Sequence, residues 1–319
     1  MKKKVINISG VSDAYSKNIH EVSSKLFKSG FLTDKKIAIS ISESDDMEEL
    51  GFHESHIKDA TIEITRYLLV NGAKLLYGGD LRKDGFTKLF SELSFQYRDK
   101  GNMDEMVFTN YFSWPIHALL QPTDKAEFKK NRVSPILVKP YENIPEELKT
   151  KFVPFDTNEN RFYWAKSLTK MRKEMVNATE ARIFIGGRIS GYKGAYSGVL
   201  EEFLFSIRND NPLYLIGAFG GVSNAIINIL SNKNDDRLSA DIQLSNNEYK
   251  EFVDYFNSNE KQDKIDYNKV QEEISQYGLG KLSKNNGLSK DENKRLFETP
   301  HIPEIIFLIL KGLSKKYRK

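Results

Sequence analysis

The sequence contains no cysteine, which excludes disulfide bridges, thiolate catalysis and zinc sites with cysteine ligands. It also lacks a long apolar run: the longest, at 305–310, falls far short of the roughly 20 residues that cross a bilayer. The basic start, Met1 to Lys4, is not followed by the apolar stretch of a secretory signal. These absences predict a cytoplasmic protein without a membrane partner.

A strong charge of one sign is missing too, because 48 basic residues stand against 44 acidic ones and the net charge is +4. Proteins that bind nucleic acid usually carry a basic face, so we expect no nucleic-acid partner. The 319 residues do contain 39% hydrophobic and 12% aromatic side chains. That content suffices for a packed core and argues against a disordered chain.

Short apolar runs alternate with stretches in which apolar residues recur at helical spacing. This alternation predicts an α/β fold, a Rossmann-like doubly wound parallel sheet with helices on both faces. In such sheets ligands bind outside the carboxyl ends of the strands. Strands are expected at 36–42, 74–77, 106–108, 136–138, 181–185 and 212–216, and helices at 57–68, 86–97, 164–178, 199–207 and 226–230.

The chain divides into three expected segments. Residues 1–30 predict an N-terminal helical segment that ends at Gly30, and 31–235 contain the α/β pattern. From about residue 232 the composition shifts to lysine, aspartate, asparagine and serine, so 236–319 predict a mostly helical C-terminal extension. A surface loop is expected at 139–160, helices at 249–256 and 270–277, a loop at 278–287 and a terminal helix from Pro303.

Three glycine-rich turns follow predicted strands. They are Gly78-Gly79-Asp80, Gly186-Gly187 with its continuation to Gly198, and Gly217 to Gly221. A glycine-rich turn from a strand into a helix leaves backbone N–H groups uncovered, which makes an anion site. The turns therefore predict a phosphorylated ligand, although glycines can also serve only to pack a turn against a sheet.

Three segments resemble the motifs of the lonely-guy (LOG) phosphoribohydrolases. They are Tyr77-Gly78-Gly79, Met171-Arg172-Lys173-Glu174-Met175 and Gly198-Val199-Leu200-Glu201-Glu202, and their order and spacing agree over about 35–230. The chain is thus identified as a long, divergent member of the SLOG superfamily, which includes LOG and DprA-like proteins. The resemblance implies that 31–235 form a nucleotide-binding domain. The chain departs from the LOG pattern at Gly194-Ala195-Tyr196, at Val199 and at Asp80, which concerns the reaction more than the fold.

The resemblance implies catalytic roles for Glu202 and Arg172, if the protein is an enzyme. In the family these positions cleave the N-glycosidic bond of a nucleoside monophosphate. A carboxylate can stabilise an oxocarbenium-like centre or activate water, and a guanidinium can hold phosphate with two hydrogen bonds. The alternative is that Glu201 and Glu202 favour the positive first turn of their helix while Arg172 lies on a solvated face.

Other residues near these turns are candidate ligand contacts. Asp80 would repel phosphate and suits a ribose hydroxyl or a cation, whereas Tyr196 could obstruct a phosphate or stack on a base. The pair His53 and His56 lacks the spacing of a zinc protease, so a role at a helix start is expected, with no metal and no firm cofactor. The ligand-contact set is Ser40, Ser42, Gly78, Gly79, Asp80, Arg82, Gly186, Gly187, Arg188, Lys193, Gly194, Tyr196, Ser197, Gly198, Glu201, Gly217 and Gly220.

We expect a protein that binds a phosphorylated nucleotide or a ligand derived from NAD or ADP-ribose. Its role would be that of a sensor or processing domain in a bacterial defence or stress-signalling system. One alternative is an N-glycosidase, either a phosphoribohydrolase or an enzyme like a deoxyribosyltransferase. Another is an interaction scaffold with a vestigial pocket. A homo-oligomer and an effector protein from a neighbouring gene are expected as partners.

Overall fold

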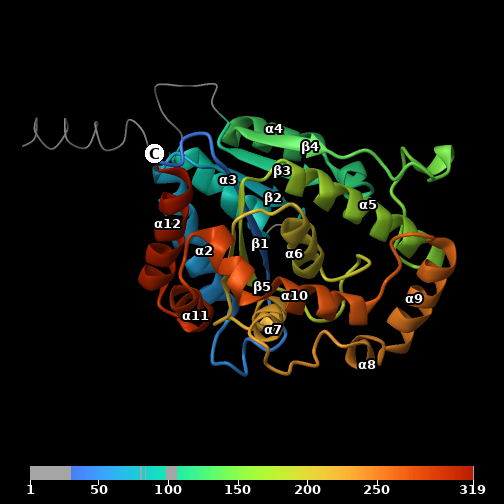
Figure 1. The fold of residues 1–319 in the computed structure, drawn as a ribbon. Coiled ribbons are helices and arrows are strands. Elements are labelled where there is room, and N and C mark those ends of the chain that lie inside the picture. The colour runs from blue at the N-terminus through green and yellow to red at the C-terminus, as the bar shows by residue number, and fades with distance from the viewer. Residues whose placement is uncertain (1–29, 80, 83, 98–105, 319) are drawn as a thin grey trace, which may run out of the picture.

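The computed structural model describes residues 30–79, 81–82, 84–97 and 106–318. At its centre lies a six-stranded, all-parallel sheet in the order β4-β3-β2-β1-β5-β6 (Figure 1). The predicted α/β fold is therefore confirmed, while the helix predicted for 1–30 lies almost wholly outside the described residues. The strands are β1 Lys36–Ser42, β2 Lys74–Gly78, β3 Phe108–Phe112, β4 Val133–Leu137, β5 Ala181–Gly186 and β6 Leu213–Ile216.

The burial of each strand follows its place in the sheet. β5 and β6 are buried at every position, as expected for strands covered by helices on both faces. β4 forms one edge and is buried only at Val133, while its other four positions are partly or fully exposed, with Pro135 in its middle. Proline cannot donate a ladder hydrogen bond, so it suits an edge strand. β3 and β4 are each displaced by two or three residues from their predicted positions.

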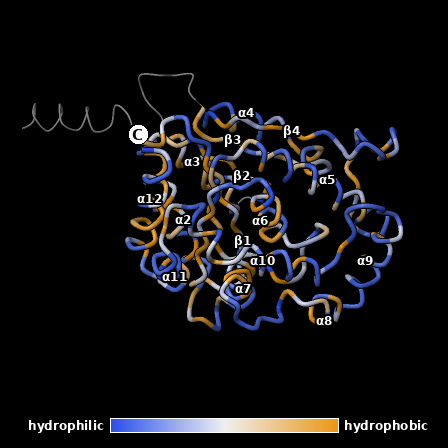
Figure 2. The backbone as a smooth tube through the Cα atoms, in the orientation of Figure 1, coloured by the Kyte–Doolittle hydropathy of each residue, from blue (hydrophilic) through white to orange (hydrophobic). Residues whose placement is uncertain are grey.

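Helices cover both faces of the sheet. One hydrophobic core joins Ile37, Ile39 and Ile41 of β1 to α2, α3, α11 and α12. Strand residues whose side chains point to the opposite face of the sheet pack against α5, α6, α7, α9 and α10. Figure 2 shows hydrophobic residues recurring along the helices between hydrophilic ones, as expected for helices with one buried side. The helices are α2 Glu54–Val70, α3 Phe86–Tyr97, α4 Pro122–Asn131, α5 Asn158–Asn177, α6 Gly198–Arg208, α7 Gly221–Leu230, α8 Ala240–Gln243, α9 Asn247–Asn259, α10 Tyr267–Asn286, α11 Lys290–Glu298 and α12 Ile302–Tyr317, with short 3-10 turns at Ile116–Leu119 and Glu146–Leu148.

The C-terminal extension is helical, as predicted, and wraps around the sheet. Its α9 and α10 pack against α5 and α7, while α11 lies along β6 and α12 along α2. The loop predicted at 278–287 is wrong, because α10 continues to Asn286. Gly278, at φ 60°, breaks the helix direction, and the chain then resumes helical geometry because Leu282 is buried in the core. No helix of the described residues is both long and apolar enough to cross a bilayer.

The first residues of α2 and α4 show how local sequence fixes where a helix begins. The His53 and His56 pair begins α2, because the His53 N–H donates to the Nδ1 atom of His56. This confirms the expected role at a helix start. α4 was not expected between the predicted strands. It begins at Pro122, and the Gln121 N–H donates to Asp124 at 2.8 Å, which satisfies a donor that the helix leaves unpaired.

Candidate functional site

The direction of strand addition reverses beside β1. The chain adds β2, β3 and β4 on one side of β1 and then places β5 and β6 on the other. Ligands of open α/β sheets bind at such a reversal, outside the carboxyl ends of the strands. The residues at this point are Ser40 and Ser42 of β1 and Gly186 of β5, which pairs with Ser42 across the sheet.

Two arginines and two glutamates form a buried network next to this point. Glu202 Oε2 accepts hydrogen bonds from Ser40 Oγ and from Nη1 of Arg182, the latter at 2.7 Å. Arg172 Nη1 forms an ion pair with Glu201, and its Nε lies 4.0 Å from Glu202 Oε1. All four charged side chains are buried. The structure thus brings together the two residues, Arg172 and Glu202, for which the resemblance implies catalysis.

Arg182 and Thr169 belong to this network and were missed in the sequence. Arg182 is wholly buried, and its burial lowers the pKa of the guanidinium, an effect that Glu202 opposes. Thr169 donates to Glu201 at 2.6 Å. A buried charge is costly unless it is paired. The signal in the sequence that could have revealed this network is the arginine inside the apolar run 181–185, since a charged residue is seldom buried in such a run without a partner.

The N-terminus of α6 lies against Arg172. Within the described part of the chain, the N–H groups of Gly198, Val199 and Leu200 have no hydrogen-bond partner. The glycines let Arg172 come close to this turn, because a Cβ on Gly194 or Gly198 would lie 2.7 or 2.8 Å from the guanidinium nitrogens of Arg172. Unpaired N–H groups, the helix dipole and a guanidinium together form an anion site. Ser197 precedes the helix, and its carbonyl oxygen accepts from the N–H of Glu201.

The glycine turns at the strand ends do not offer uncovered N–H groups in the predicted way. The N–H groups of Gly187 and Arg188 both donate to Ser42, to its carbonyl oxygen at 2.9 Å and its hydroxyl at 3.2 Å. The N–H of Gly79 donates to the carbonyl oxygen of Tyr111 at 3.0 Å. The N–H groups of Gly79, Gly187 and Arg188 are therefore not available to an anion, because neighbouring strand ends accept from them. In the second turn the N–H at Gly198, where the turn enters α6, stays unpaired among the described residues.

The third turn is closed by a carboxylate of the chain itself. Asp46 accepts a hydrogen bond from the N–H of Gly221 at 2.8 Å and pairs with Arg237 at 2.8 Å. The Gly217 N–H donates to the carbonyl oxygen of Phe297. The prediction of an open anion site at this turn is also wrong, because Asp46 occupies the positive end of α7. Gly220 lies against Asp46 rather than beside Arg172.

The first turn is separated into two environments. Gly78 lies against Met171 and Met175 of α5, on the same helix as Arg172. Asp80 lies outside the described residues. Arg82 instead lines a separate cavity of about 470 Å³ with Thr87 and other residues of α3 and α4. Gly78 therefore provides a packing surface for α5.

The remaining predicted cations lie on the second turn. Arg188 is partly exposed, with its guanidinium 3.9 Å from the Glu43 carboxylate. Lys193 lies over an aromatic ring, with its ammonium 4.5 Å from the centre of the Trp164 ring. Neither side chain contacts the Arg172 network by a hydrogen bond or ion pair within the described residues.

A cavity of about 350 Å³ opens beside the second turn. Tyr196, a residue that could obstruct a phosphate or stack on a base, is not among the residues that line this cavity. Its hydroxyl accepts from the Asp266 N–H at 2.7 Å, and its ring packs edge-on against Tyr267, so it anchors the turn to the extension. Residues of three segments line the cavity: Phe155, Arg161, Ser190, Gly191, Tyr192, Gly194, Gln243, Asn246, Glu248, Tyr249 and Phe252.

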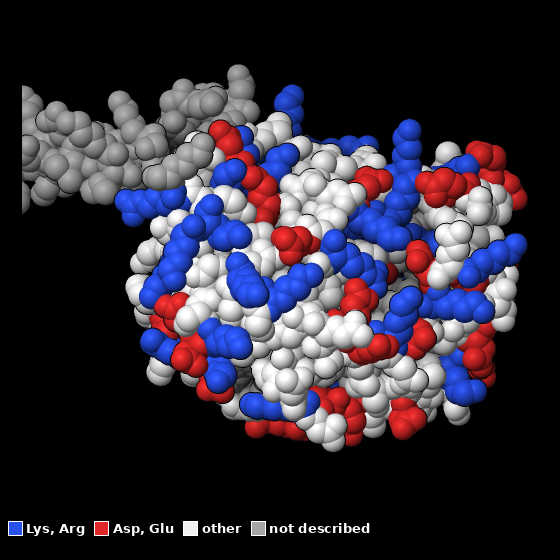
Figure 3. Space-filling view, viewed as in Figure 1, with Lys and Arg blue, Asp and Glu red and all other residues white. Residues whose placement is uncertain are grey.

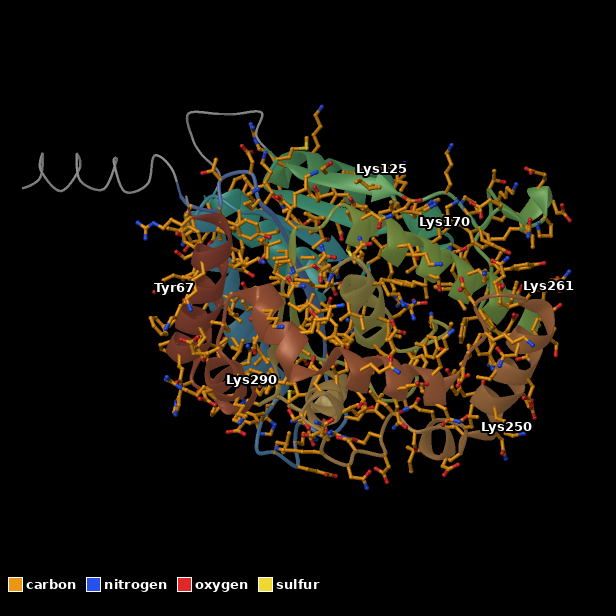
Figure 4. All side chains as sticks on the ribbon, in the orientation of Figure 1. Tyr67, Lys125, Lys170, Lys250, Lys261 and Lys290 are labelled. Carbon is orange, nitrogen blue, oxygen red and sulfur yellow. The ribbon has the colours of Figure 1, made fainter. Side chains whose placement is uncertain are left out.

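Charges of both signs surround this region. Figure 3 shows basic and acidic side chains interspersed over the face where α5, α9 and α10 meet, and in Figure 4 Lys170 and Lys261 project from that side of the molecule. Among the described residues, no group of three histidine, aspartate or glutamate side chains is placed to hold a metal ion. The site is therefore built from ion pairs, glycines and aromatic rings.

Comparison with known proteins gives one family. A search of curated proteins finds no match. A family model described as SLOG cluster2 matches residues 31–296. That range contains all six strands, the Arg172 network, the cavity and most of the C-terminal extension. The chain belongs to the SLOG cluster2 family.

Proposed function

We propose that this protein binds a phosphorylated nucleotide at the carboxyl edge of β1 and β5. The observation that carries the proposal is the meeting of the α6 N-terminus with Arg172. Three unpaired N–H groups, at Gly198, Val199 and Leu200, adjoin a guanidinium held by the rest of the fold. Donors in this arrangement suit the oxygens of a phosphate.

Glu202 supports a nucleotide rather than phosphate alone. Its Oε2 is fixed by Ser40 and Arg182, whereas its Oε1 accepts no hydrogen bond from the described residues. A ribose hydroxyl is a donor of suitable chemistry for this carboxylate oxygen. Phosphate and ribose therefore find complementary groups on neighbouring residues, which matches the nucleotide ligands implied by the resemblance to LOG proteins.

The ion pair between Arg172 and Glu201 suits a sensor. A phosphate that binds Arg172 competes with Glu201, so the side chains that join α5 to α6 rearrange when ligand arrives. We include ligands derived from NAD or ADP-ribose among the proposed ligands because they carry both phosphate and ribose. A role in bacterial defence or stress signalling, with an effector partner, follows from the superfamily resemblance.

The test is binding by calorimetry and thermal shift with AMP, NAD, ADP-ribose and cyclic ADP-ribose isomers. We expect at least one ligand to bind, and Arg172→Lys to weaken that binding about tenfold or more, because an ammonium lacks the planar fork of a guanidinium. Arg66→Lys, at a partly exposed ion pair on α2, is the matched control and should leave affinity unchanged. Absence of binding by every ligand contradicts the proposal.

A second candidate is an N-glycosidase, favoured by the position of Glu202. A carboxylate held by Arg182 and Ser40, with one free oxygen near Arg172, can stabilise positive charge on a ribosyl carbon or activate water. Incubation with nucleoside monophosphates should then release free base, measured by chromatography. Glu202→Gln should abolish the release, and release that persists in this variant would exclude the assigned role.

A further inference from the structure

The cavity beside the second glycine turn is a candidate site for an aromatic ring. Its volume of about 350 Å³ lies within the range of about 300–1,000 Å³ that small-molecule sites occupy. Four aromatic residues line it: Phe155, Tyr192, Tyr249 and Phe252. Flat aromatic walls favour a flat aromatic ligand, since stacking requires no particular pattern of hydrogen bonds.

Arg161 adds a planar cation to these walls. Its guanidinium lies 5.2 Å from the centre of the Phe155 ring and pairs with Glu248. The buried Nε atom has no hydrogen-bond partner in the described part of the chain. A guanidinium with an unpaired N–H can stack on an electron-rich ring of a ligand and donate one hydrogen bond to the same ligand.

The aromatic walls are already ordered without a ligand. The Tyr192 hydroxyl donates to Gln243 at 2.7 Å, and the Tyr249 hydroxyl donates to the carbonyl oxygen of Ala195 at 2.7 Å. Both hydroxyls also contact that of Tyr267. Because protein groups satisfy the hydroxyls, the ring surfaces are what these residues offer to a ligand. A preformed wall reduces the ordering cost of binding.

Gly194 joins this cavity to the anion site. It lines the cavity, and the position of its missing Cβ lies 2.7 Å from Nη1 of Arg172. A single ligand can therefore place a ring in the cavity and a phosphate at Arg172. Residues of the C-terminal extension form one wall, so the extension takes part in recognition.

We infer that this cavity binds the planar base of a nucleoside 5′-phosphate or dinucleotide whose phosphate lies at Arg172, an inference that rests on the proposed function. Phe155 is the residue to test because it is partly exposed and lines the cavity. Phe152 is the matched control. It also packs edge-on against Trp164, yet it is no part of the cavity wall.

The experiment measures AMP and ribose 5-phosphate binding by calorimetry to the full chain. Phe155→Ala and Phe155→Leu should each weaken AMP binding by roughly 5- to 150-fold, the range expected for loss of one base-stacking contact. Ribose 5-phosphate has no base, so its affinity should not change, and Phe152→Ala should affect neither ligand. The leucine variant keeps apolar bulk, which separates lost stacking from disturbed packing.

Each of the following outcomes would overturn the ring site, the proposed function or both. If ribose 5-phosphate binds but AMP binds no more tightly, phosphate binding stands and the ring site is overturned. AMP binding that survives both Phe155 substitutions also overturns the ring site alone. If no nucleotide and no sugar phosphate binds the unmodified protein, the proposed function and this inference both fail.

Discussion

Arg182 shows what one buried side chain demands of its surroundings. It is wholly enclosed and donates its hydrogen bonds to Glu202, Ser40 and Thr179. We expect Arg182→Met to lower the free energy of unfolding by about 3–5 kcal/mol, because it leaves the Glu202 carboxylate without its buried cation. Chemical denaturation with urea measures this change.

A second variant separates lost charge from lost packing. Adding Glu202→Gln to Arg182→Met removes the unpaired charge, so the double variant should be more stable than the single one. Lys74→Met is the surface control, since Asp34 in that ion pair is 70% exposed. It should change stability by less than about 1 kcal/mol. A small effect of Arg182→Met would contradict the view that Glu202 is held by this pair.

Asp46 offers a prediction about anion binding. Because its carboxylate occupies the N-terminus of α7, removing it should cost about 1–2 kcal/mol, the size of a lost helix cap. It should also open a site that inorganic phosphate can fill. The expected result is that phosphate raises the melting temperature of Asp46→Ala more than that of the unmodified protein. Equal phosphate responses would show that the helix end stays closed.

At the scale of elements, the junction of α5 with the end of α9 should respond to acid. Burial raises the pKa of Glu260, but the Lys166 ammonium and the N–H groups of Gln262 and Asp263 outweigh it and hold the pKa at about 2. The folded pKa lies below the ordinary 4.5, so this group stabilises the fold above about pH 4.5. That contribution should disappear as the pH falls towards 2.

The comparison of Glu260→Gln with the unmodified protein tests this pH dependence. The stability difference between them should be largest near neutral pH and shrink as the pH falls from about 5 to about 2.5. Ser258→Ala, an exposed position on α9 that carries no titratable group, is the control, and its stability difference from the unmodified protein should not change with pH. Urea denaturation at several pH values gives the measurement. A difference that stays constant with pH would contradict the assigned pairing.

Sequence patterns predicted elements best where burial is regular. The short run of β5, apolar except for Arg182, and the helical spacing of apolar residues in α3 were identified because each has a regular burial pattern. α4 was missed because only Phe128 and Asn131 in it are buried, which leaves little apolar periodicity. The loop expected at 278–287 was wrong because Gly278 resembles a helix stop, whereas tertiary packing of Leu282 continues the helix.

The candidate site was predictable only in part. The family motifs singled out Arg172 and Glu202 together, and the two side chains do lie close to each other, because α5 and α6, which carry them, pack side by side. No local pattern could reveal that Asp46 closes the third turn, because Asp46 and Gly221 are far apart in the sequence. For the same reason the cavity was not foreseen, as its walls come from three separate segments.

For the whole molecule, we expect the segments 31–235 and 236–319 not to fold separately. The core on one face of the sheet combines Phe203 and Ile226 with Phe256 and Ile274 of the extension, all fully buried or nearly so. A fragment ending at residue 235 would expose that apolar surface to water. It should therefore bind the dye ANS strongly and unfold without a cooperative transition in urea.

Truncation after Tyr317 is the matched control for the shortened fragment. It leaves the buried core of α12 intact, so unfolding should remain cooperative. A sharp urea transition in the fragment ending at 235 would show instead that the α/β part is an independent unit. Circular dichroism and denaturation curves of both variants distinguish the two results.

The two ends of the described chain meet at one corner (Figure 1). The Lys35 ammonium lies 5.1 Å from the centre of the Tyr317 ring, and both residues contact Glu180 just before β5. This corner is at the amino ends of the strands, whereas the anion site and cavity lie at their carboxyl ends. A domain fused to either end would attach at the end of the sheet opposite the proposed ligand site. In the proposed sensor, any coupling between that domain and the ligand site would have to pass through the length of the sheet.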